Sequence, residues 1–414
     1  MINFYNKKPL IEGVLIEDIL KSCSTPLYIY SQDRITSKYN ELKKSLCENI
    51  FFAVKANSNQ AILKLINHLG AGADVVSIGE LKRSLSAGFA PEKIIFEGVG
   101  KSSEDIQFAI TANIKLINIE SIDELNRINN VAHSMNKIVD VGIRLNPDID
   151  NETIQKISTG KKSDKFGIEI SKIGVIIDII KESKNLNLIG ISCHIGSQIR
   201  SLLTFKKIFA EMRKTAEILI NNGINIKHLD LGGGINVKYK ENDPDIDLSH
   251  IKLELDKNFK DSNYEISFEP GRYLVANAGV IATSVLTTKK NGQINYLITD
   301  AGMNTLIRPA MYNAYHKVEA LNLLSDKKIN YTIAGPICES SDIILKNIEL
   351  PKQESGNILL IRDTGAYGAV MASNYNSRTL PSEVLVNKKS FFIIYKPKTI
   401  EEHINEDKIP DWLI

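Results

Sequence analysis

Short apolar runs alternate with longer amphipathic stretches over the first two thirds of the chain. Apolar runs rich in β-branched residues are typical of strands that are buried on both faces. The stretches between them place apolar residues three and four positions apart, as helices with one buried face do. Eight runs have strand character: 51–56, 73–77, 93–98, 115–120, 139–146, 188–196, 226–234 and 264–272.

This alternation predicts parallel strands joined by crossover helices, which is an α/β architecture. Eight such units favour a closed (β/α)8 barrel of the TIM type, with a doubly wound open sheet as the alternative. Beyond the eighth unit the strand-like runs follow one another with few helical stretches, which predicts an all-β domain, a β-sandwich or barrel. We therefore expect a barrel domain over 26–280, entered by the strand-like run 25–31, and a β domain made of 1–25 and 281–414.

Composition and charge narrow the class of function. The formal net charge of the 414 residues is +2, which points to neither nucleic acid nor an anionic membrane as a partner. The N-terminus lacks the apolar core of a signal peptide, and no apolar run reaches the ~18 residues that span a bilayer. The four cysteines are scattered without the spacing of zinc ligands, as reduced thiols are. We expect a soluble cytoplasmic protein without a metal site.

Polar residues and glycines follow the strand-like runs. In a (β/α)8 barrel the carboxyl ends of the strands carry the chemistry, so these residues are candidates for a shared site. Lys55 ends the apolar run "FFAVK", where the solvation of a strand end would by itself also account for a lysine. The further candidates are Asp74, Ser77, Glu97, Glu120, Arg144, Asn146, His194, Ser197, Gly232, Gly233, Gly234, Glu269 and Arg272.

Two adjacent strand ends have the features of a phosphate site. Three glycines in "LDLGGG", residues 229–234, leave their backbone N–H groups open to an anion, and "EPGR", residues 269–272, follows the last strand. Barrels of this type often bind phosphate after the seventh and eighth strands. A lysine, a phosphate site and a carboxylate in one barrel mouth fit pyridoxal 5'-phosphate.

Three residues have expected roles in binding this cofactor. Lys55 would form the Schiff base, because the apolar run desolvates its ammonium and favours the reactive neutral amine. Glu269 would face the pyridinium nitrogen and keep the ring protonated, so that the ring accepts electrons. His194, in "CHIGSQ", would stack on the face of the ring.

Seven motifs relate the chain to a known family: "FFAVKAN", "HIGSQ", "LDLGGG", "EPGR", "RPAMYNAYH", "GPICESSD" and "GAYGAVMASNYNSR". With them the chain resembles the diaminopimelate decarboxylases, fold-type III pyridoxal phosphate enzymes of lysine biosynthesis, over nearly its whole length. The first four motifs are shared with related decarboxylases, and the last three are more specific. Ile78, in "SIGEL", departs from the expected glycine beside the site. The resemblance implies a two-domain fold like that of alanine racemase and ornithine decarboxylase.

The resemblance implies decarboxylation of meso-2,6-diaminopimelate at its D centre to L-lysine and carbon dioxide, the last step of the diaminopimelate pathway. Lys55 and Cys338 are then the catalytic residues, and Cys338 protonates the carbanion. The implied cofactor-binding residues are Lys55, Asp74, His194, Ser197, Gly233, Gly234, Glu269, Pro270, Gly271, Arg272 and Tyr367. The implied substrate-binding residues are Arg272, Arg308, Tyr312, Glu339 and Tyr367.

The resemblance also implies a homodimer with shared active sites, in which Cys338 and Glu339 reach the cofactor of the other subunit. Three other functions stay open: a related decarboxylase acting on ornithine, lysine, arginine or carboxynorspermidine, an alanine racemase, and an inactive relative that regulates a partner. The motif "RPAMY", with Arg308 and Tyr312, favours a diaminopimelate enzyme, because ornithine and lysine have no distal carboxylate for the arginine to bind.

Overall fold

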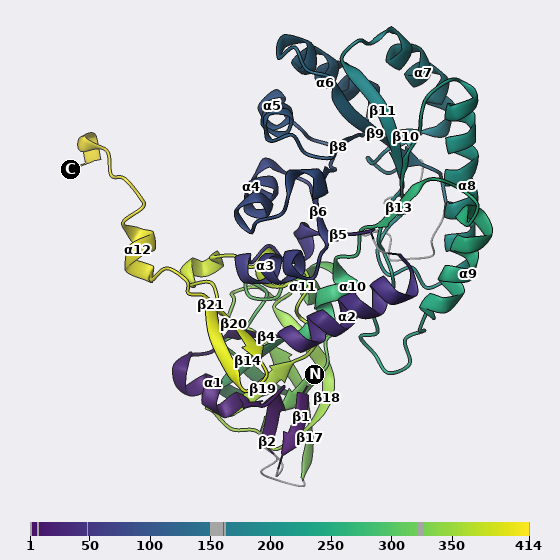
Figure 1. Ribbon diagram of the computed structural model, residues 1–414. Coiled ribbons are helices and arrows are strands. Elements are labelled where there is room, and N and C mark those ends of the chain that lie inside the picture. Colours follow the sequence, from purple (N-terminus) through teal and green to yellow (C-terminus); the bar gives the residue numbers. More distant parts are fainter. Residues whose placement is uncertain are drawn as a thin grey trace. The chain divides into compact units, whose positions relative to one another are not determined.

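The computed structural model describes residues 2–5, 8–47, 49–149, 160, 163–321 and 327–413 of the chain. Its contacts divide the chain into two compact units, which Figure 1 shows as ribbons. The barrel unit consists of Thr36–Lys238 and Asp243–Leu274. The β unit consists of Met1–Ile35, Tyr239–Asn242 and Val275–Ile414.

Eight parallel strands form the sheet of the barrel unit, and each overlaps one of the eight predicted runs. They are β5 (Asn49–Ala53), β6 (Gly72–Val75), β7 (Ile94–Phe96), β8 (Leu116–Ile119), β9 (Val139–Asn146), β11 (Leu186–Ser192), β12 (His228–Asp230) and β13 (Glu265–Phe268). The pairings of β13 with β5 and of β8 with β9 close the ring, and the short β10 (Ile168–Glu169) is added to β9. The closed barrel is therefore confirmed, and the open-sheet alternative is wrong.

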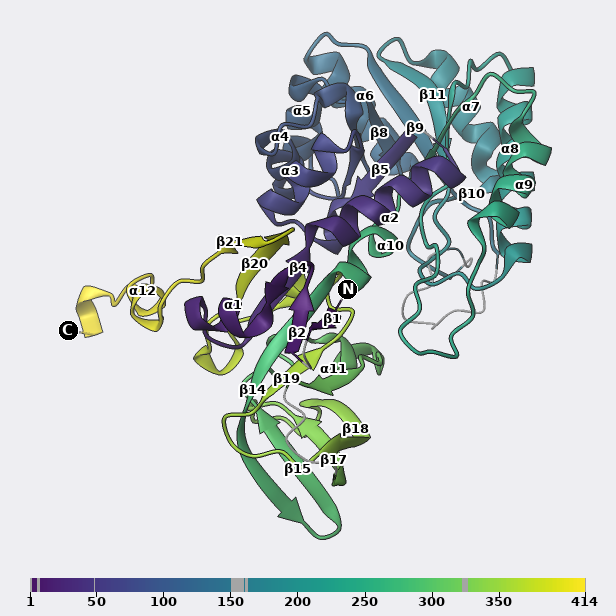
Figure 2. The same ribbon diagram turned by 60° about the horizontal axis from the view of Figure 1, so that its bottom comes forward.

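Helices surround these strands, as Figure 2 shows. They are α2 (Gln32–Ser45), α3 (Gln60–His68), α4 (Ile78–Ser86), α5 (Ser103–Ala112), α6 (Ile122–Ser134), α7 (Ile173–Glu182), α8 (Leu202–Asn221), α9 (Leu248–Phe259) and α10 (Arg272–Val275). Local sequence sets several of their ends. The side chains of Asn59 and Ser121 cap α3 and α6, and Gly70, with φ of 101°, lets the chain turn away after α3.

The interior of the barrel changes from apolar to polar along the strands. Phe51, Ile95 and Leu116 form a buried cluster, against which Ile189 packs. Residues two positions apart on a strand point to the same side, so Glu97 and Asn118 follow Ile95 and Leu116 inside the barrel. The apolar layer thus fills the barrel interior on the side of the amino ends of the strands. The polar side chains lie toward the carboxyl ends.

The β unit contains sheets in which both parallel and antiparallel strands pair. Its path of paired strands runs β18-β17-β15-β14-β4-β20-β21, and β19 joins β14 to β16. These strands are β4 (Leu27–Ser31), β14 (Gly279–Asn291), β15 (Ile294–Thr299), β16 (Val318–Ala320), β17 (Lys328–Ala334), β18 (Ile343–Pro351), β19 (Ile358–Ile361), β20 (Ser382–Asn387) and β21 (Ser390–Tyr395). Smaller elements complete the unit: β1 (Ile2–Tyr5), β2 (Lys8–Ile11), β3 (Val14–Leu15), α1 (Ile16–Ser22), α11 (Arg308–Tyr312) and α12 (Ile400–Ile404).

The run 25–31, expected to enter the barrel, belongs to the other unit. Its strand β4 pairs antiparallel with β14 and parallel with β20. Leu27 and Ile29 of this strand pack into the apolar core of the β unit. The prediction that this run enters the barrel was wrong, because the apolar pattern of a strand does not reveal which sheet will pair with it.

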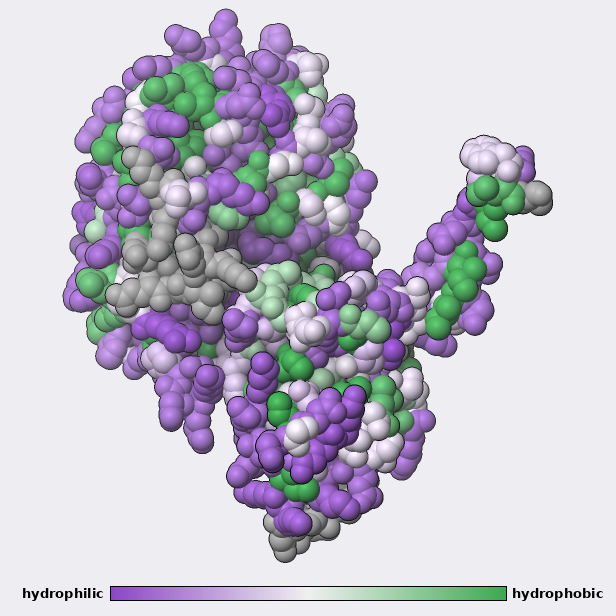
Figure 3. Space-filling view, turned by 180° about the vertical axis from the view of Figure 1, so that it is seen from behind, coloured by the Kyte–Doolittle hydropathy of each residue, from purple (hydrophilic) through white to green (hydrophobic). Residues whose placement is uncertain are grey.

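The surface carries one group of exposed apolar residues near the C-terminus. Figure 3 shows hydrophobic side chains along this segment. The exposed residues are Ile400, Ile404, Ile409, Trp412 and Leu413. Within the part of the chain that the structure describes, no helix is long and apolar enough to cross a membrane.

Candidate active site

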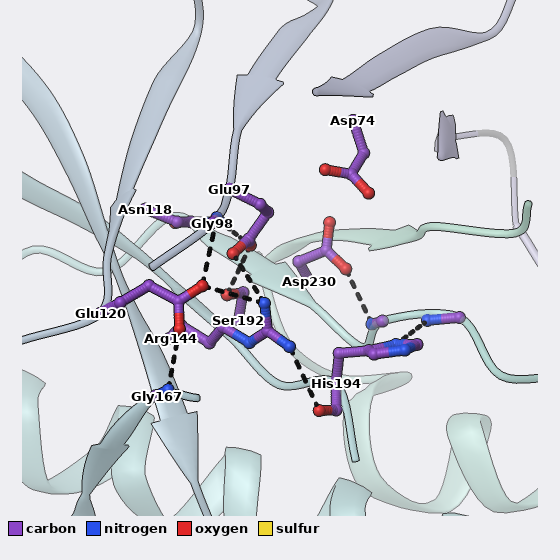
Figure 4. A network of polar contacts seen from close by, with 12 residues as sticks. Asp74, Glu97, Gly98, Asn118, Glu120, Arg144, Gly167, Ser192, His194 and Asp230 are labelled. Atoms are coloured by element: carbon purple, nitrogen blue, oxygen red, sulfur yellow. Dashed lines mark hydrogen bonds and ion pairs between the residues drawn. The ribbon is translucent and has the colours of Figure 1, made fainter. Parts of the chain in front are cut away.

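A buried network of charges crosses the polar end of the barrel interior (Figure 4). Arg144 of β9 donates from Nη1 to Glu120 Oε1 at 3.0 Å and lies 3.5 Å from Glu97 Oε2. Ser192 donates to Glu97 Oε1 at 2.9 Å, and Asn118 also hydrogen-bonds this carboxylate. Burial lowers the pKa of Arg144, but Glu97 and Glu120 outweigh it and raise the pKa above its usual value. Arg144 therefore stays charged inside the barrel.

Lys55 and Asp74 meet at the ends of two adjacent strands. Lys55 lies directly after β5, in the short helix Val54–Ala56, and its Nζ is 3.3 Å from Asp74 Oδ2. The side chain of Asp74 is fully buried, whereas that of Lys55 is about one third exposed. Burial raises the pKa of Asp74, and the ammonium of Lys55 opposes this rise. The structure thus brings these two predicted site residues together.

Glu269 follows β13 and is buried among other carboxyl groups. Its Oε1 has no hydrogen-bond partner among the described residues. Burial, and then the charges of Asp230 and Asp74, raise the pKa of Glu269 well above its usual value. A buried carboxyl oxygen without a partner is costly, so this group is suited to a polar ligand atom that enters the barrel.

The three glycines after β12 form a tight loop against two neighbouring strand ends. Gly232 N donates to Asp230 Oδ1 at 2.8 Å, and Glu269 N donates to Gly232 O at 2.8 Å. Gly232 and Gly234 have φ of 71° and 81°, and a Cβ at Gly234 would lie 2.3 Å from Gly196 O. Any side chain here would strain the loop and clash with the main chain around it. The N–H groups of Gly232 and Gly233 already donate to Asp230 and His194, so the N–H of Gly234 remains the candidate donor of the predicted anion cradle.

His194 is held as a neutral imidazole beside this loop. Gly233 N donates to His194 Nδ1 at 3.1 Å, so this nitrogen carries no hydrogen. Burial, and then the charges of Lys55 and Arg144, lower the pKa of His194 well below its usual value. A neutral ring with a fixed orientation is suited to stacking on a planar ligand.

Two further predicted residues meet near the loop. Arg272, the first residue of α10, donates from Nε to Ser197 Oγ at 3.0 Å. Gly271 lies against Ala53 and Ala56, where a Cβ would approach both side chains to about 3 Å. The close packing brings the EPGR segment against the backbone around Lys55. The predicted cofactor residues of the barrel unit therefore lie together at the strand ends, and Tyr367 belongs to the β unit.

The remaining predicted residues lie in the β unit. Cys338 is exposed, and its backbone N donates to Asn376 Oδ1 at 3.1 Å. Glu339 is also exposed and accepts a hydrogen bond of 2.6 Å from the hydroxyl of Tyr375. The carboxylate of Asp342 accepts from two backbone N–H groups of neighbouring loops and fixes this segment. The segment therefore presents a thiol and a carboxylate at the surface of the unit.

Arg308 is buried in the same unit at the start of α11. Its Nη1 lies 2.8 Å from His316 Nε2, and its guanidinium packs on the ring of Tyr239. Tyr312 ends α11 and is partly buried, and Tyr367 has a left-handed backbone with φ of 55°. His316 and Tyr239 were not among the site residues predicted from the sequence. The last position of "RPAMYNAYH" was the only signal for His316, and Tyr239 had none.

Comparisons with known proteins agree with the motifs. The family model described as the pyridoxal binding domain of pyridoxal-dependent decarboxylases matches residues 32–276. A diaminopimelate decarboxylase of Neisseria meningitidis serogroup A is 40% identical over 396 residues, which cover 95% of this chain and 97% of that protein.

Solved structures of diaminopimelate decarboxylases also resemble the chain over nearly its whole length. The diaminopimelate decarboxylase of Helicobacter pylori, complexed with L-lysine, has a TM-score of 0.90 and 38% identity, and the match covers 94% of this chain and 99% of that one. The enzyme of M. jannaschii, in co-complex with L-lysine, has a TM-score of 0.93 and 34% identity, with coverage of 100% and 99%.

Proposed function

The chain belongs to the diaminopimelate decarboxylases, and we propose that it removes the carboxyl group at the D centre of meso-2,6-diaminopimelate and releases L-lysine and carbon dioxide. The observation that carries this proposal is the barrel site, in which a lysine, a buried glutamate and a glycine loop meet at the strand ends. The family match extends over nearly the whole chain, so both units belong to the proposal.

The residues of the barrel unit fit pyridoxal phosphate, the cofactor of this family. Glu269 Oε1, which has no hydrogen-bond partner among the described residues, suits a ring nitrogen, and the N–H of Gly234, in a loop too tight for side chains, suits a phosphate group. When bound, pyridoxal phosphate supplies a conjugated ring that takes up the electron pair left behind by carbon dioxide. We assign the attachment of the cofactor to Lys55, whose Nζ is already oriented by Asp74.

Three residues of the barrel unit then have distinct tasks. Glu269, a buried carboxyl group whose pKa is raised, pairs with the ring nitrogen and keeps a proton at that nitrogen. His194, neutral and fixed by Gly233, packs on the ring face without adding a positive charge. Ser197 and Arg272 bind the phosphate and substrate side of the site together with the glycine loop.

The β unit supplies the proton and most of the substrate contacts, and Arg272 of the barrel unit adds one more. Cys338 Sγ donates a proton to the carbon that has lost its carboxyl group, a task that suits a thiol. Arg272, Arg308 and Tyr312 bind the distal carboxylate of the substrate, because guanidinium groups pair with carboxylates through two parallel hydrogen bonds. Glu339 binds the distal ammonium, and Tyr367 contacts the cofactor phosphate and the substrate.

We propose that the active form is a homodimer with shared sites, in which Cys338 and Glu339 of each chain serve the other chain's cofactor. The exposure of both side chains supports this arrangement, since a general acid must be shielded from water when it acts. The exposed apolar residues near the C-terminus provide additional surface that favours association.

One assay tests the reaction directly. Release of carbon dioxide should be measured from meso-diaminopimelate, its L,L isomer, ornithine and L-lysine, with L-lysine formation followed in parallel. We expect equal amounts of carbon dioxide and L-lysine from the meso compound and almost none from the other three. Faster release from ornithine or L-lysine would instead assign the chain to the diamine-forming decarboxylases.

A further inference from the structure

Two aromatic side chains hold the guanidinium of Arg308 in the β unit. Arg308 Nη1 lies 2.8 Å from His316 Nε2, and Arg308 Cζ lies 4.9 Å from the centre of the Tyr239 ring. The rings of Tyr239 and His316 also meet edge to face, with centres 5.4 Å apart and planes at 81°. Arg308 and His316 are both buried. We call these three residues the arginine clamp.

The hydrogen-bond roles of His316 follow from its two partners. His316 Nδ1 lies 2.9 Å from the carbonyl oxygen of Arg362, and a carbonyl only accepts, so Nδ1 carries the hydrogen. A guanidinium only donates, so His316 Nε2 accepts from Arg308. His316 is therefore neutral and acts as a rigid spacer between the main chain at Arg362 and the guanidinium.

Tyr239 fixes the plane of the same guanidinium from its face. An arginine stacks readily on an aromatic ring, which restrains its plane without using its N–H donors. The residues Tyr239–Asn242 come from the segment between β12 and α9 and cluster with the β unit. Tyr239 follows Gly234, the end of the glycine loop, by only five positions, so the clamp and the cradle are closely linked along the chain.

We propose that His316 and Tyr239 are positioning residues that orient Arg308 for the distal carboxylate of the substrate and so set the preference for ligands that carry this group. The inference rests on the proposed function, which gives Arg308 that task. Two parallel hydrogen bonds to a carboxylate require a fixed guanidinium plane, and a long arginine side chain loses much rotational freedom to reach it. A guanidinium that is already held in the binding orientation loses less conformational entropy when the carboxylate binds.

The test compares two ligands that differ in the distal carboxylate. L-lysine retains this carboxylate and its neighbouring ammonium, and 1,5-diaminopentane is the same chain without the carboxylate. Their binding to the holoenzyme is titrated through the change in absorbance of the bound cofactor, which does not depend on turnover. We expect His316→Leu and Tyr239→Leu each to weaken L-lysine binding about tenfold and to leave 1,5-diaminopentane binding nearly unchanged.

Conservative variants separate positioning from a general structural role. His316→Gln retains an acceptor for Arg308, and Tyr239→Phe retains the ring, so both should recover most of the L-lysine affinity. Tyr315→Leu is the matched control, because it removes a neighbouring ring that packs with Lys240 and should leave both affinities unchanged. In steady-state kinetics the leucine variants should raise KM for diaminopimelate more than they lower kcat.

Each outcome bears on one of the two proposals. A wild-type protein that binds both ligands equally would overturn the role of Arg308 and with it this part of the proposed function. A wild-type protein that prefers L-lysine, together with leucine variants that keep this preference or lose both ligands equally, would overturn the clamp. If His316→Leu does not fold, Tyr239→Leu, whose side chain is only partly buried, decides the question by the same titration.

Discussion

The barrel interior and the surface segment around Cys338 differ in how they hold polar groups. In the barrel, Asp74, Glu97 and Glu269 are buried with Arg144, and their charges act on one another. Cys338 and Glu339 are instead exposed, and each takes part in a hydrogen bond with a residue of the same unit. Buried charges require compensation that is built into the fold, whereas exposed groups acquire a dry environment only when another surface covers them.

Under the proposed function, this difference separates two kinds of contribution to one reaction. The barrel unit contains the groups whose charge is set before the substrate arrives. The β unit contains the proposed proton donor and most of the residues proposed to bind the substrate, and Arg272 of the barrel unit adds to them. The arginine clamp lies between these extremes, because Arg308 is buried and restrained but belongs to the β unit.

The largest effect is expected at Lys55, the residue proposed to attach the cofactor. Lys55→Ala should lose nearly all turnover, because the chain then lacks the amine that attaches the cofactor. Borohydride treatment followed by peptide mass analysis should find the cofactor on Lys55 in the wild type and on no lysine in the variant. A single modified lysine elsewhere in the variant would show that the assignment is wrong.

Cys338→Ala should lower turnover by about 10²–10⁴, the range typical of a lost general acid. Its mixture with Lys55→Ala tests whether the sites are shared. After random subunit exchange, half of the dimers are hybrids, and each hybrid has one site with both residues intact, so up to about a quarter of the wild-type activity should return. No recovery, with exchange verified independently, would mean that Cys338 serves its own chain.

Glu269→Gln should change the pH dependence of stability in the cofactor-free protein. The folded state raises the pKa of Glu269 above 4.5, so it binds more protons than the unfolded state as the pH rises beyond that value. Glu269 therefore costs stability increasingly from about pH 4.5 upward, and the glutamine variant lacks this cost. Denaturant unfolding should find the variant more stable than the wild type at neutral pH, with a difference that shrinks toward pH 4.5. A difference independent of pH would contradict the burial argument.

Arg308→Ala should lower kcat/KM for diaminopimelate at least about tenfold while the cofactor stays bound, because a charged hydrogen bond is worth about 1.5–3 kcal/mol. Steady-state kinetics and the cofactor absorbance measure the two effects separately. An unchanged kcat/KM would reject a role for this arginine in substrate binding.

Tyr375→Phe should have the smallest effect, because it removes one hydrogen bond to the exposed Glu339. The net loss of such a bond is about 0.5 kcal/mol, which corresponds to about a twofold rise in KM for diaminopimelate. A much larger rise in KM would indicate that Tyr375 and Glu339 are buried in the active assembly. The segment would then resemble the barrel interior, where polar groups are buried.

The sequence alone predicted the eight barrel strands to within a few residues, together with the polar residues that follow them. Strands buried on both faces read as continuous apolar runs, so Lys55 and Glu269 stood out at the point where each run stopped. Motifs also identified Cys338 and Arg308, because the chemistry of a family fixes residue types at short spacing. These features are local in the chain, and local features are visible without coordinates.

Only the tertiary structure decided which distant residues meet. It assigned β4 to the β unit, joined Arg144 to Glu97 and Glu120, and brought Tyr239 and His316 to Arg308. Pairing between strands and contacts across a barrel depend on packing between segments far apart in sequence, and no periodicity within one segment records its partner. The sequence therefore predicted which residue types carry the proposed chemistry. The burial of these side chains and the contacts that restrain them could be seen only in the fold.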